Sequence, residues 1–464
     1  MVRTKIIATI GPACDDRKKI EKLIKAGVNV FRLNVKHNTL DWHKIRLERI
    51  RQVAEKLGVP IGVMVDIKGP ELRIGKLKKG RIDLKRGETV RLGPKGQIVF
   101  ENLSVLRELK KGQRILLDDG RIELEVIEGR EDRVKAKVVA GGPLSSHKGV
   151  NLPETELMLP TISDQDLEAI RIAKKFQVDF VALSFVREKN DIRILKRVLE
   201  KERVNALIIA KIETASAIEN FEEILSETDG VMVARGDLGV ELPMEEVPFW
   251  QKYIINRCLG ASKPVITATE MLSSMMENPR PTRAEVSDIA NSVYDYSDAV
   301  MLSAETAIGK YPVKAVLVMR KTCEFIEGKL EPKGSDFIVH EQAAAMVLAA
   351  FDLVKESELS QSFKAFVVLT EEGKTARLLS SLRPKLPVLA ITPVKTVQCQ
   401  LCLSFGVESF YFDYRKDEVG KVVKSTIEFL KKKEKLKTGD KIVMIYGDDW
   451  RFPGRTNLVR IQEV

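Results

Sequence analysis

Charged and polar side chains follow several short apolar runs of this chain. Each run has the length and composition of a buried strand, and the residue that could do chemistry comes where the run ends. Any one of these residues could simply take part in a structural ion pair. Six runs that each end in charged or polar side chains, all expected at the same edge of a sheet, are hard to explain by packing alone. They are Arg32, Asn34, Asp66, Lys68, Lys211, Glu213, Arg235, Gly236, Asp237, Thr269, Ser303 and Glu305.

Two of these residues, Glu213 and Asp237, place carboxylates at the ends of neighbouring runs. Mg²⁺ typically takes one or two protein carboxylates and completes its octahedron with water and substrate oxygens. The positive charges of Arg32, Arg73 and Lys211 would surround such an ion. Phosphoryl transfer needs this arrangement, because negative charge spreads over the oxygens of the moving group and catalysis is largely positioning and electrostatic stabilisation.

The segment 234–247, ARGDLGVELPMEEV, adds a second kind of anion site. We expect Gly236 and Asp237 to form a tight turn before a helical segment, which would leave backbone N–H groups free for an anion such as a carboxylate. The glycines alone would be a weak signal.

The elements that must position these side chains alternate between apolar runs and segments with helical periodicity. Eight such runs predict a (β/α)₈ TIM barrel, whose active site lies at the carboxyl ends of its strands. The runs are 5–11, 28–34, 61–67, 179–186, 206–213, 230–238, 263–271 and 298–305.

Two further parts interrupt or follow the barrel. The interval from Lys76 to Val150 is rich in glycine and alternating strands and contains no convincing helix, so we expect an inserted all-β domain. A Pro/Gly boundary at 331–336 precedes strand-like runs 363–370, 386–392, 407–412 and 441–447, which predict an open α/β domain. The predicted domains are therefore 1–69 with 154–330 (barrel), 70–153 (inserted β-barrel lid) and 331–464 (C-terminal, regulatory or oligomerisation).

Composition bounds the class of protein. The chain has 464 residues, 44% hydrophobic and 31% charged, with no long uncharged apolar window, so we expect a cytoplasmic protein with no membrane partner. The net charge of +11 is dispersed, and its densest run, 431–437, is typical of a solvated helix end, so we expect no nucleic-acid partner. Cys399 and Cys402 form a lone CxxC pair, which we interpret as a half-buried helix face in preference to a metal or redox site.

The chain resembles the pyruvate kinase family over almost its full length. The matching motifs are long and occur in collinear order. They are TIGPA (9–13), FRLN with His37 (31–37), DIKGPELRIG (66–75), DDGRIELEV (118–126), KGVNLP (148–153), ALSFVRE (182–188), KIET (211–214), GVMVARGDLGVEL (230–242), ATEMLSSMMENPRPTRAEVSDIAN (268–291) and DAVMLSAETAIGKYP (298–312).

This resemblance implies Mg²⁺- or Mn²⁺-dependent transfer of the phosphoryl group of phosphoenolpyruvate to ADP, giving pyruvate and ATP in the last step of glycolysis. It implies that Glu213 and Asp237 ligate the metal, that Arg32 and Lys211 hold the phosphoryl group, and that the Gly236 and Asp237 amides with Thr269 grip the substrate carboxylate. Lys211 would also stabilise the enolate, and Thr269 and Ser303 acting through water are candidate proton sources. We expect replacement of Lys211 to slow turnover and to affect folding little.

On the nucleotide side, the family pattern points to Pro12, Asn34, His37, Arg73 and Lys148. Trp42 stands where the family often has tyrosine near the adenine, and its indole face would stack at least as well. The alternative for Trp42 is an exposed helix aromatic. The resemblance further implies a homotetramer with allosteric control.

The monovalent-cation site departs from the family pattern. Most members bind K⁺ through an asparagine, a serine, an aspartate and a threonine; here Asn34 and Asp66 remain, but Lys36 and Ile67 occupy the other two positions. We expect Lys36 to pair with Asp66 and to replace K⁺, so that activity does not require it. The alternative, which the retained Glu71 supports, is that Lys36 points to solvent and K⁺ still binds.

A second departure lies in the C-terminal domain, where 369–384 resembles an effector loop with Thr370, Lys374 and Thr375 as phosphate contacts. Glu371, Glu372 and the segment 446–457 differ from the form associated with fructose 1,6-bisphosphate. We expect a nucleoside or sugar monophosphate as effector, or none.

Two alternatives to the pyruvate kinase reaction remain. The alternative enzyme is a Mg²⁺-dependent pyruvate or phosphoenolpyruvate lyase or aldolase on a TIM barrel, and the non-enzymatic alternative is a basic barrel that binds polyanions.

Overall fold

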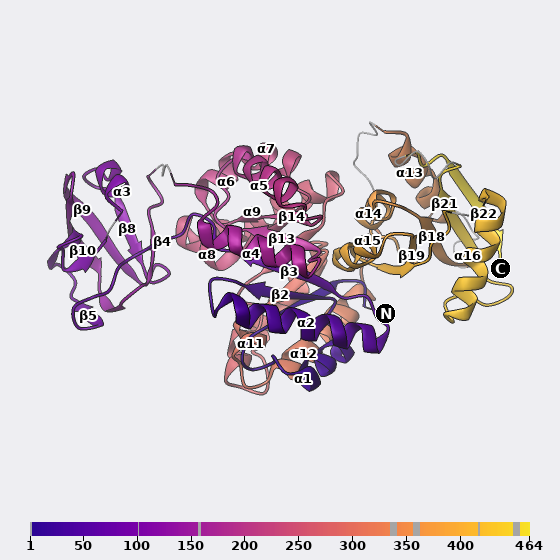
Figure 1. Ribbon diagram of the computed structural model, residues 1–464, viewed down its shortest axis with the longest axis horizontal. Coiled ribbons are helices and arrows are strands. Elements are labelled where there is room, and N and C mark those ends of the chain that lie inside the picture. Colours follow the sequence, from indigo (N-terminus) through magenta and orange to yellow (C-terminus); the bar gives the residue numbers. More distant parts are fainter. Residues whose placement is uncertain are drawn as a thin grey trace.

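The computed structural model describes residues 2–100, 102–155, 159–334, 341–355, 362–415, 418–448 and 455–464. The molecule is elongated, with a central barrel, a small β-rich part on one side and an α/β part on the other (Figure 1). His340 lies outside the described residues. So do residues 449–454, which belong to the segment 446–457 considered above.

The centre is a closed barrel of eight strands in the order β1-β17-β16-β15-β14-β13-β3-β2, which confirms the predicted TIM barrel. Neighbouring strands are parallel, and every strand lies within one of the predicted apolar runs. They are β1 (Lys5–Thr9), β2 (Val30–Asn34), β3 (Gly62–Ile67), β13 (Phe180–Leu183), β14 (Leu207–Ile212), β15 (Gly230–Ala234), β16 (Val265–Ala268) and β17 (Ala299–Leu302).

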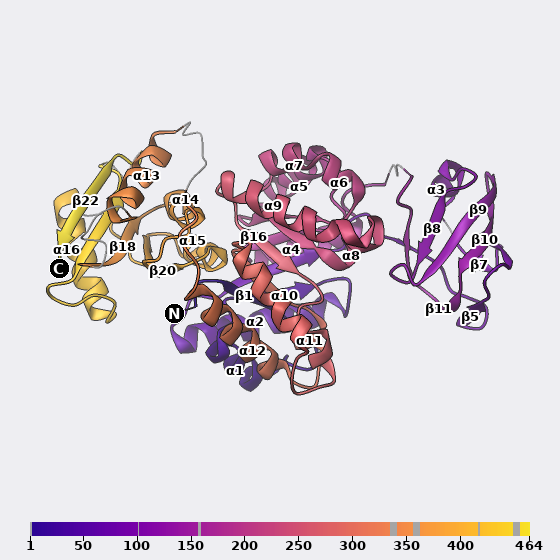
Figure 2. The ribbon, with the colours of Figure 1, turned by 180° about the vertical axis from the view of Figure 1, so that it is seen from behind.

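Helices cover the outside of the barrel, and their ends carry capping residues. Ser163 and Thr282 each form a capping box at the start of a helix, and α1 ends at Gly27. Figure 2 shows α9, α10 and α12 on one outer face. The helices are α1 (Arg17–Ala26), α2 (Leu40–Leu57), α4 (Asp164–Lys175), α5 (Lys189–Glu202), α6 (Ala215–Glu219), α7 (Phe221–Glu227), α8 (Arg235–Glu241), α9 (Val247–Gly260), α10 (Arg283–Tyr294), α11 (Ala304–Ala307) and α12 (Pro312–Glu327), with 3₁₀ turns η1 (Met244–Glu246) and η2 (Ser273–Met276).

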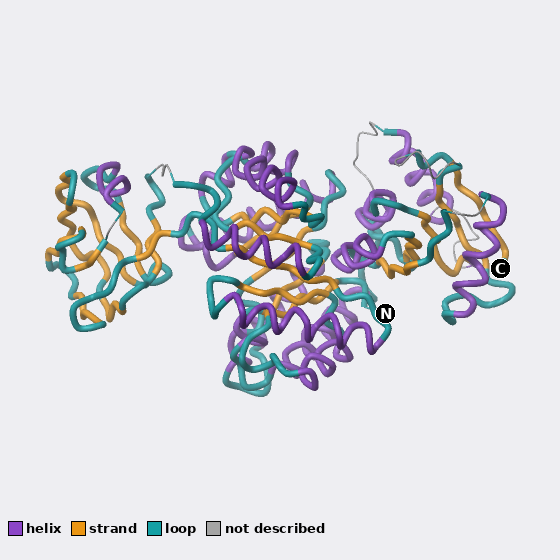
Figure 3. The backbone as a smooth tube through the Cα atoms, viewed as in Figure 1, coloured by secondary structure: helices purple, strands orange, loops and turns teal. Residues whose placement is uncertain are grey.

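The β-rich part leaves the barrel after β3 and returns before α4, and Figure 3 shows that it consists mainly of strands and loops. It has a hydrophobic core of its own. Its strands alternate buried and exposed residues, as β10 does. The expectation that residues 76–150 contain no helix was wrong. A short helix, α3 (Leu103–Glu108), lies here, and the Asn102 side chain caps it. The strands are β4 (Leu72–Arg73), β5 (Arg81–Leu84), β6 (Thr89–Gly93), β7 (Ile98–Val99), β8 (Arg114–Leu117), β9 (Ile122–Arg130), β10 (Arg133–Ala140), β11 (Gly142–Ser145) and β12 (Gly149–Asn151).

The C-terminal part is a five-stranded sheet in the order β20-β19-β18-β21-β22 with helices packed on it. Strand β22 pairs antiparallel at one edge and has no counterpart among the predicted runs. The elements are α13 (Gln342–Lys355), β18 (Phe363–Leu369), α14 (Lys374–Ser381), β19 (Val388–Thr392), α15 (Lys395–Gln400), η4 (Leu401–Leu403), β20 (Val407–Tyr411), α16 (Val419–Lys432), β21 (Lys441–Tyr446) and β22 (Leu458–Glu463).

Both cysteines of the CxxC pair are free thiols at the junction of α15 and η4. Burial raises the pKa of Cys399 to about 11, which makes its thiolate scarce. Within the described ranges, no group of three or more histidine, cysteine, aspartate or glutamate side chains could hold a metal ion. Over the same ranges, no helix has the length and apolar character needed to cross a membrane.

Candidate active site

The charged residues at the strand ends meet inside the mouth of the barrel. Asn34 on β2 lies in register with Asp66 on β3, which brings the ends of these strands together. The Arg32 guanidinium donates through Nε to Asp66 Oδ2 (2.7 Å), and its Nη1 donates to Thr9 Oγ1 (3.1 Å). Arg32 and Asp66 therefore form a buried, hydrogen-bonded ion pair near the carboxyl ends of β2 and β3.

Lys211, at the end of β14, connects this pair to a second carboxylate. Its Nζ donates to Ser184 Oγ (2.8 Å) and lies 2.7 Å from Glu213 Oε1 and 3.4 Å from Asp66 Oδ1. Burial alone would lower the pKa of Lys211, but the charges of Asp66 and Glu213 raise it, so the ammonium stays protonated. Burial opposes ionisation of Asp66 too, yet Lys211, Arg32 and Lys36 hold its pKa down at about 2.

Ser184 and Phe185, which follow β13, belong to this cluster and were missed from the sequence. Besides accepting from Lys211, Ser184 Oγ has two acceptors within reach of its one hydrogen, the carbonyl of Ile67 (3.0 Å) and Asp66 Oδ1 (3.3 Å). The backbone N–H of Phe185 donates to Glu213 Oε2 (2.7 Å). Run 179–186 ends without a charged residue, so a pattern of charges at run ends does not point to Ser184 or Phe185.

Glu213 and Asp237 have the properties of ligands for a divalent cation. Glu213 is fully buried, and its Oε1 makes no hydrogen bond with any described residue, although Lys211 contacts it. Burial and then the charge of Glu213 raise the pKa of Asp237 to about 6. Two mutually repelling carboxylates at the ends of neighbouring strands fit a Mg²⁺-type ion, which needs few protein ligands.

Gly236 and Asp237 lie in the first turn of α8, not in a turn before it as expected. The Gly236 N–H donates to Thr269 Oγ1 (2.8 Å), so this amide and this hydroxyl are adjacent. Thr269 has φ 69°, a left-handed conformation that is uncommon outside glycine and often found at functional sites. Arg235 has a structural role instead, because both its Nη atoms bind Asp288 (2.6 and 2.7 Å).

Ser303 follows β17 and is half-buried. Its backbone N–H donates to Glu305 Oε2 (2.7 Å), while Glu305 Oε1 accepts from the Leu272 N–H (3.0 Å). Glu305 therefore braces the loops after β16 and β17, a structural role, and no hydrogen bond of Ser303 with Thr269 is found among the described residues.

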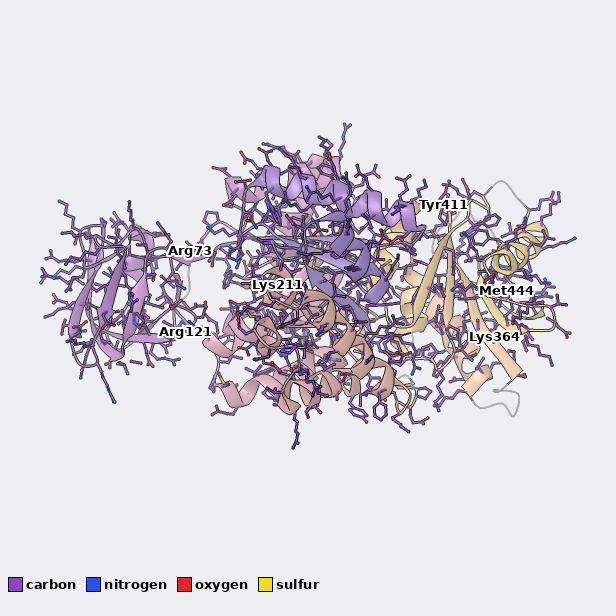
Figure 4. All side chains as sticks on the ribbon, turned by 90° about the horizontal axis from the view of Figure 1, so that it is seen from below. Arg73, Arg121, Lys211, Lys364, Tyr411 and Met444 are labelled. Carbon is purple, nitrogen blue, oxygen red and sulfur yellow. The ribbon has the colours of Figure 1, made fainter. Side chains whose placement is uncertain are left out.

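The β-rich part faces this rim across a cleft of about 940 Å³. Its lining includes Asp119 and Arg121 on one side and Asp237 and Glu270 on the other. Figure 4 shows Arg73 and Arg121 on the side of the β-rich part that faces the barrel, with Lys211 inside the barrel. The cleft is thus lined by charges of both signs, with Arg121 as the cation from the β-rich part and Arg235 and Lys252 as the cations from the barrel.

Comparisons with known proteins agree with this geometry. Family models described as pyruvate kinase, barrel domain, and pyruvate kinase, alpha/beta domain, match residues 1–316 and 346–462. Pyruvate kinases of Staphylococcus epidermidis and Staphylococcus aureus are each 41% identical over 476 residues, covering all of this chain and 81% of each relative. A crystal structure of a pyruvate kinase from Cryptosporidium parvum has a TM-score of 0.90 at 33% identity, covering 99% of this chain and 96% of that one.

The chain belongs to the pyruvate kinase family. Its function is that of the family, transfer of the phosphoryl group of phosphoenolpyruvate to ADP to give pyruvate and ATP, and the lyase or aldolase alternative is not favoured. The pyruvate kinase reaction is a step of glycolysis and requires a divalent metal.

Among the residues expected on the nucleotide side of a pyruvate kinase, His37 shares its surroundings with the cations of the site. Burial lowers the pKa of His37, and the charges of Arg73, Arg32 and Lys36 lower it further. Arg73 donates to the His147 carbonyl (2.8 Å), and Lys148 follows His147 just before β12, the strand that pairs with β4.

The other residues expected to bind the nucleotide make contacts outside this group of cations around His37. Lys148 pairs with Asp118 (2.6 Å) within the β-rich part. The indole of Trp42 is half-buried, with the Arg46 guanidinium 4.1 Å from its ring centroid, which corrects the picture of a freely exposed aromatic. Pro12 lies in the loop after β1, where the following residue, Ala13, donates to the Ala307 carbonyl (2.9 Å).

Lys36 does not form the ion pair with Asp66 that we expected. Its Nζ is 4.0 Å from Glu71 Oε1 and 4.6 Å from the centroid of the Phe185 ring. The side chain is only 13% exposed, so it does not extend into solvent either. Asp66 is instead paired with Arg32 from the neighbouring strand β2 and with Lys211 from β14, two strands away.

The expected effector residues lie far from the barrel mouth, in the C-terminal part (Figure 1). Thr370 Oγ1 accepts from the Gly373 N–H (2.9 Å), Thr375 Oγ1 is hydrogen-bonded to Thr456 Oγ1 (2.8 Å), and Lys374 pairs with Glu341. The two threonine hydroxyls and the Lys374 ammonium thus each contact another group of the protein.

Proposed function

We propose that this chain carries out the pyruvate kinase reaction with Arg32 and Lys211 holding the transferred phosphoryl group and Gly236, Asp237 and Thr269 holding the substrate carboxylate. The observation that supports this assignment best is the buried cluster in which Lys211 contacts Glu213, Asp66 and Ser184 within 3.4 Å. Preformed charges in a buried site stabilise the developing charge of the transition state without reorganisation.

We further propose that Glu213 and Asp237 hold the divalent metal, Mg²⁺ or Mn²⁺. When bound, the metal would supply Lewis-acid stabilisation of phosphoryl and enolate oxygens. Lys211 keeps its ammonium beside the same oxygens, so it would stabilise the enolate after the phosphoryl group leaves. Thr269 and Ser303, through water, remain our candidates for the path of the proton to the enolate carbon.

On the nucleotide side we propose that Pro12, Asn34, His37, Trp42, Arg73 and Lys148 bind ADP. Arg73 ends β4, and Lys148 directly precedes β12, which pairs with β4. Figure 4 shows Arg73 on the side of the β-rich part that faces the barrel. We propose that residues 70–153 act as a lid that brings these cations over the phosphates, with 1–69 and 154–330 as barrel and 331–464 as regulatory domain.

We propose that K⁺ is not required. The corner formed by Asn34, Lys36, Asp66 and Ile67 does not fit a K⁺ ion, because Asp66 is engaged by two cations and the buried Ile67 side chain has no oxygen. The Lys36 ammonium supplies the positive charge there. Addition of KCl to the enzyme in K⁺-free tetramethylammonium buffer should change kcat by less than about threefold; activation above about tenfold, ~1.4 kcal/mol, would contradict this proposal.

Regulation and assembly are further proposals. Thr370, Lys374 and Thr375 are the proposed contacts of a nucleoside or sugar monophosphate effector, and the test is a shift of the phosphoenolpyruvate saturation curve by AMP or a pentose or hexose monophosphate, with Thr375→Ala as the variant. Exposed Phe249 (62%) and Phe325 (69%) support assembly of copies of this chain, which we propose to be a homotetramer. Five free cysteines support a cytoplasmic location.

The experiment that tests the main proposal is a coupled assay of pyruvate release with phosphoenolpyruvate and a divalent metal, with and without ADP. Strictly ADP-dependent release supports phosphoryl transfer. Release of pyruvate without ADP would instead support the lyase reading.

A further inference from the structure

Phe185 is held in a strained backbone conformation between two charged groups of the active site. Its φ is 53°, in the left-handed region, where a bulky residue other than glycine is a genuine outlier. Such strain persists only where the surroundings fix it, most often at functional sites. The strained conformation therefore calls for a role that the sequence alone did not assign.

Two parts of Phe185 contact different members of the site. Its backbone N–H donates to Glu213 Oε2 (2.7 Å), one of the carboxylates assigned to the metal. Its ring lies under Lys36, with Nζ 4.6 Å from the ring centroid. The residue before it, Ser184, binds Lys211 (2.8 Å). The dipeptide thus joins the proposed monovalent-cation corner to the metal carboxylate and to Lys211.

The Phe185 ring matters for Lys36 because the ion pair of Lys36 with Glu71 is weak. Glu71 lies 4.0 Å from Lys36, beyond hydrogen-bonding distance. Both carboxylate oxygens of Glu71 accept from Arg73, at 3.1 and 2.8 Å. With only 13% of its side chain exposed, Lys36 has little water to replace these contacts. The face of an aromatic ring attracts an ammonium through its quadrupole and carries no charge that would neutralise it.

We propose that Phe185 is a positioning residue that seats the Lys36 ammonium by a cation–π contact, at a fixed place relative to Glu213. This inference rests on the proposed function, in which Lys36 replaces the monovalent cation. The seat leaves the positive charge of Lys36 available to an anionic substrate, which a tight carboxylate partner would not. This role accounts for the backbone strain. With an ordinary φ, Phe185 could not keep its N–H on Glu213 and its ring under Lys36 at the same time.

The test changes the electronics of the ring and leaves its shape nearly unchanged. Phenylalanine with one, two and then more ring fluorines is incorporated at position 185, since fluorination progressively weakens the negative face of the ring. We expect kcat in K⁺-free tetramethylammonium buffer to fall stepwise along the series, by roughly threefold to thirtyfold in total. In a Lys36→Met background the same series should be flat, because the cation is absent.

Two controls separate this role from simple packing. Fluorination of Phe180, buried in β13 inside the barrel, should leave kcat within about twofold of the unmodified enzyme. Affinity for Mn²⁺, measured by electron paramagnetic resonance without substrate, should stay constant along the Phe185 series, because the N–H bond to Glu213 is unchanged. Loss of Mn²⁺ affinity in parallel with kcat would overturn the proposal, since the ring would then act through Glu213.

The remaining outcomes distinguish failure of this inference from failure of the proposed function. A flat series in an enzyme that does not respond to KCl would retain Lys36 as the cation and reject Phe185 as its seat. An equal decline in the Lys36→Met background would also reject it. Strong KCl activation of the unmodified enzyme would instead reject the role of Lys36, and the inference with it.

Discussion

Replacement of Lys211 by methionine removes the one ammonium that contacts both Asp66 and Glu213. Lys211 is almost fully buried, and its Nζ lies 2.7 Å from Glu213 Oε1 and 3.4 Å from Asp66 Oδ1. Asp66 keeps Arg32 as a partner in the variant, whereas for Glu213 the described part of the chain leaves only the Phe185 N–H. Glu213 would then be a buried carboxylate without a countercharge in the metal-free enzyme.

This arrangement changes the expectation from sequence that folding would be little affected. Breaking a buried ion pair by removing one partner costs about 3–5 kcal/mol, because the remaining charge is desolvated and unpaired. Part of this loss is relieved when Glu213 takes up a proton. We therefore expect the free energy of unfolding of the metal-free enzyme, measured in urea at pH 7.5, to fall by roughly 2–4 kcal/mol. Added Mg²⁺ should restore part of it by neutralising Glu213.

The effect on turnover should be at least as large. Removing one preorganised electrostatic donor from an active site typically reduces kcat by about 10²–10³, or about 3–4 kcal/mol in the barrier. The assay couples pyruvate release to lactate dehydrogenase at saturating phosphoenolpyruvate, ADP and Mg²⁺. Lys5→Met is a matched control, because Lys5 is also fully buried but lies at the start of β1 and donates to the Val407 carbonyl (2.7 Å). It should keep kcat within about twofold.

Two results would refute this reasoning. A Lys211→Met enzyme with more than about a tenth of the wild-type kcat would deprive the residue of its role in the transition state. An unchanged free energy of unfolding would show that Glu213 does not depend on Lys211 for its countercharge.

Two further predictions concern stability. Because the pKa of Asp66 is about 2 in the folded protein, the unfolded chain binds more protons in acid, so ionisation of Asp66 stabilises the fold by about 2 kcal/mol, relative to its protonated form, at pH 5 and above and by roughly half that at pH 3. The difference in unfolding free energy between wild type and Asp66→Asn should narrow accordingly in urea titrations, and a constant difference would contradict the assignment. In Gly11→Ala the added Cβ would lie 2.3 Å from the Ala307 carbonyl oxygen, so we expect a loss of about 1–3 kcal/mol by thermal unfolding. Gly260→Ala, where nothing lies within 4 Å, is the control and should be neutral or stabilising; equal losses in both would show that the contact with Ala307 is not the cause.

The barrel was predictable from sequence because its strands are buried on both faces and therefore appear as continuous apolar runs. Helix α3 and strand β22 were not, for a related reason. Helix α3 has only six residues, too few to show a period, and β22 is an edge strand whose sequence, LVRIQE, is half polar and largely exposed. Elements that bury little surface leave little pattern in the sequence.

The candidate site was predictable in its charges but not in its pairings. Strand ends identify Arg32, Asp66, Lys211 and Glu213 because parallel strands of a barrel deliver their last residues to one face. Which carboxylate Lys36 meets depends on loop geometry and rotamers. The role of Phe185 depends on a left-handed backbone angle that its residue type would argue against. Neither property is encoded in spacing.

The charges of the site explain why the two family departures, Lys36 and Ile67, belong together. Asp66, Glu213 and Asp237 face Arg32, Lys211 and Lys36, and the positive charge of Lys36 lowers the pKa of both Asp66 and Asp237. Loss of Lys36 would leave an excess negative charge beside the phosphoryl site. A monovalent cation could replace it only where oxygen ligands are present, and the buried Ile67 side chain supplies none.

We therefore expect Lys36→Met alone to lose activity that KCl restores poorly. Lys36→Ser combined with Ile67→Thr adds two hydroxyl oxygens in the same corner, and this double variant should be activated by KCl more than about tenfold, ~1.4 kcal/mol in the barrier. The measurement is kcat against KCl concentration at constant ionic strength set with tetramethylammonium chloride, with Ile67→Thr alone as the control. Equal KCl responses of Lys36→Met and the double variant would show that oxygen ligands are not what the corner lacks, and the explanation of both departures by one exchanged cation would be wrong.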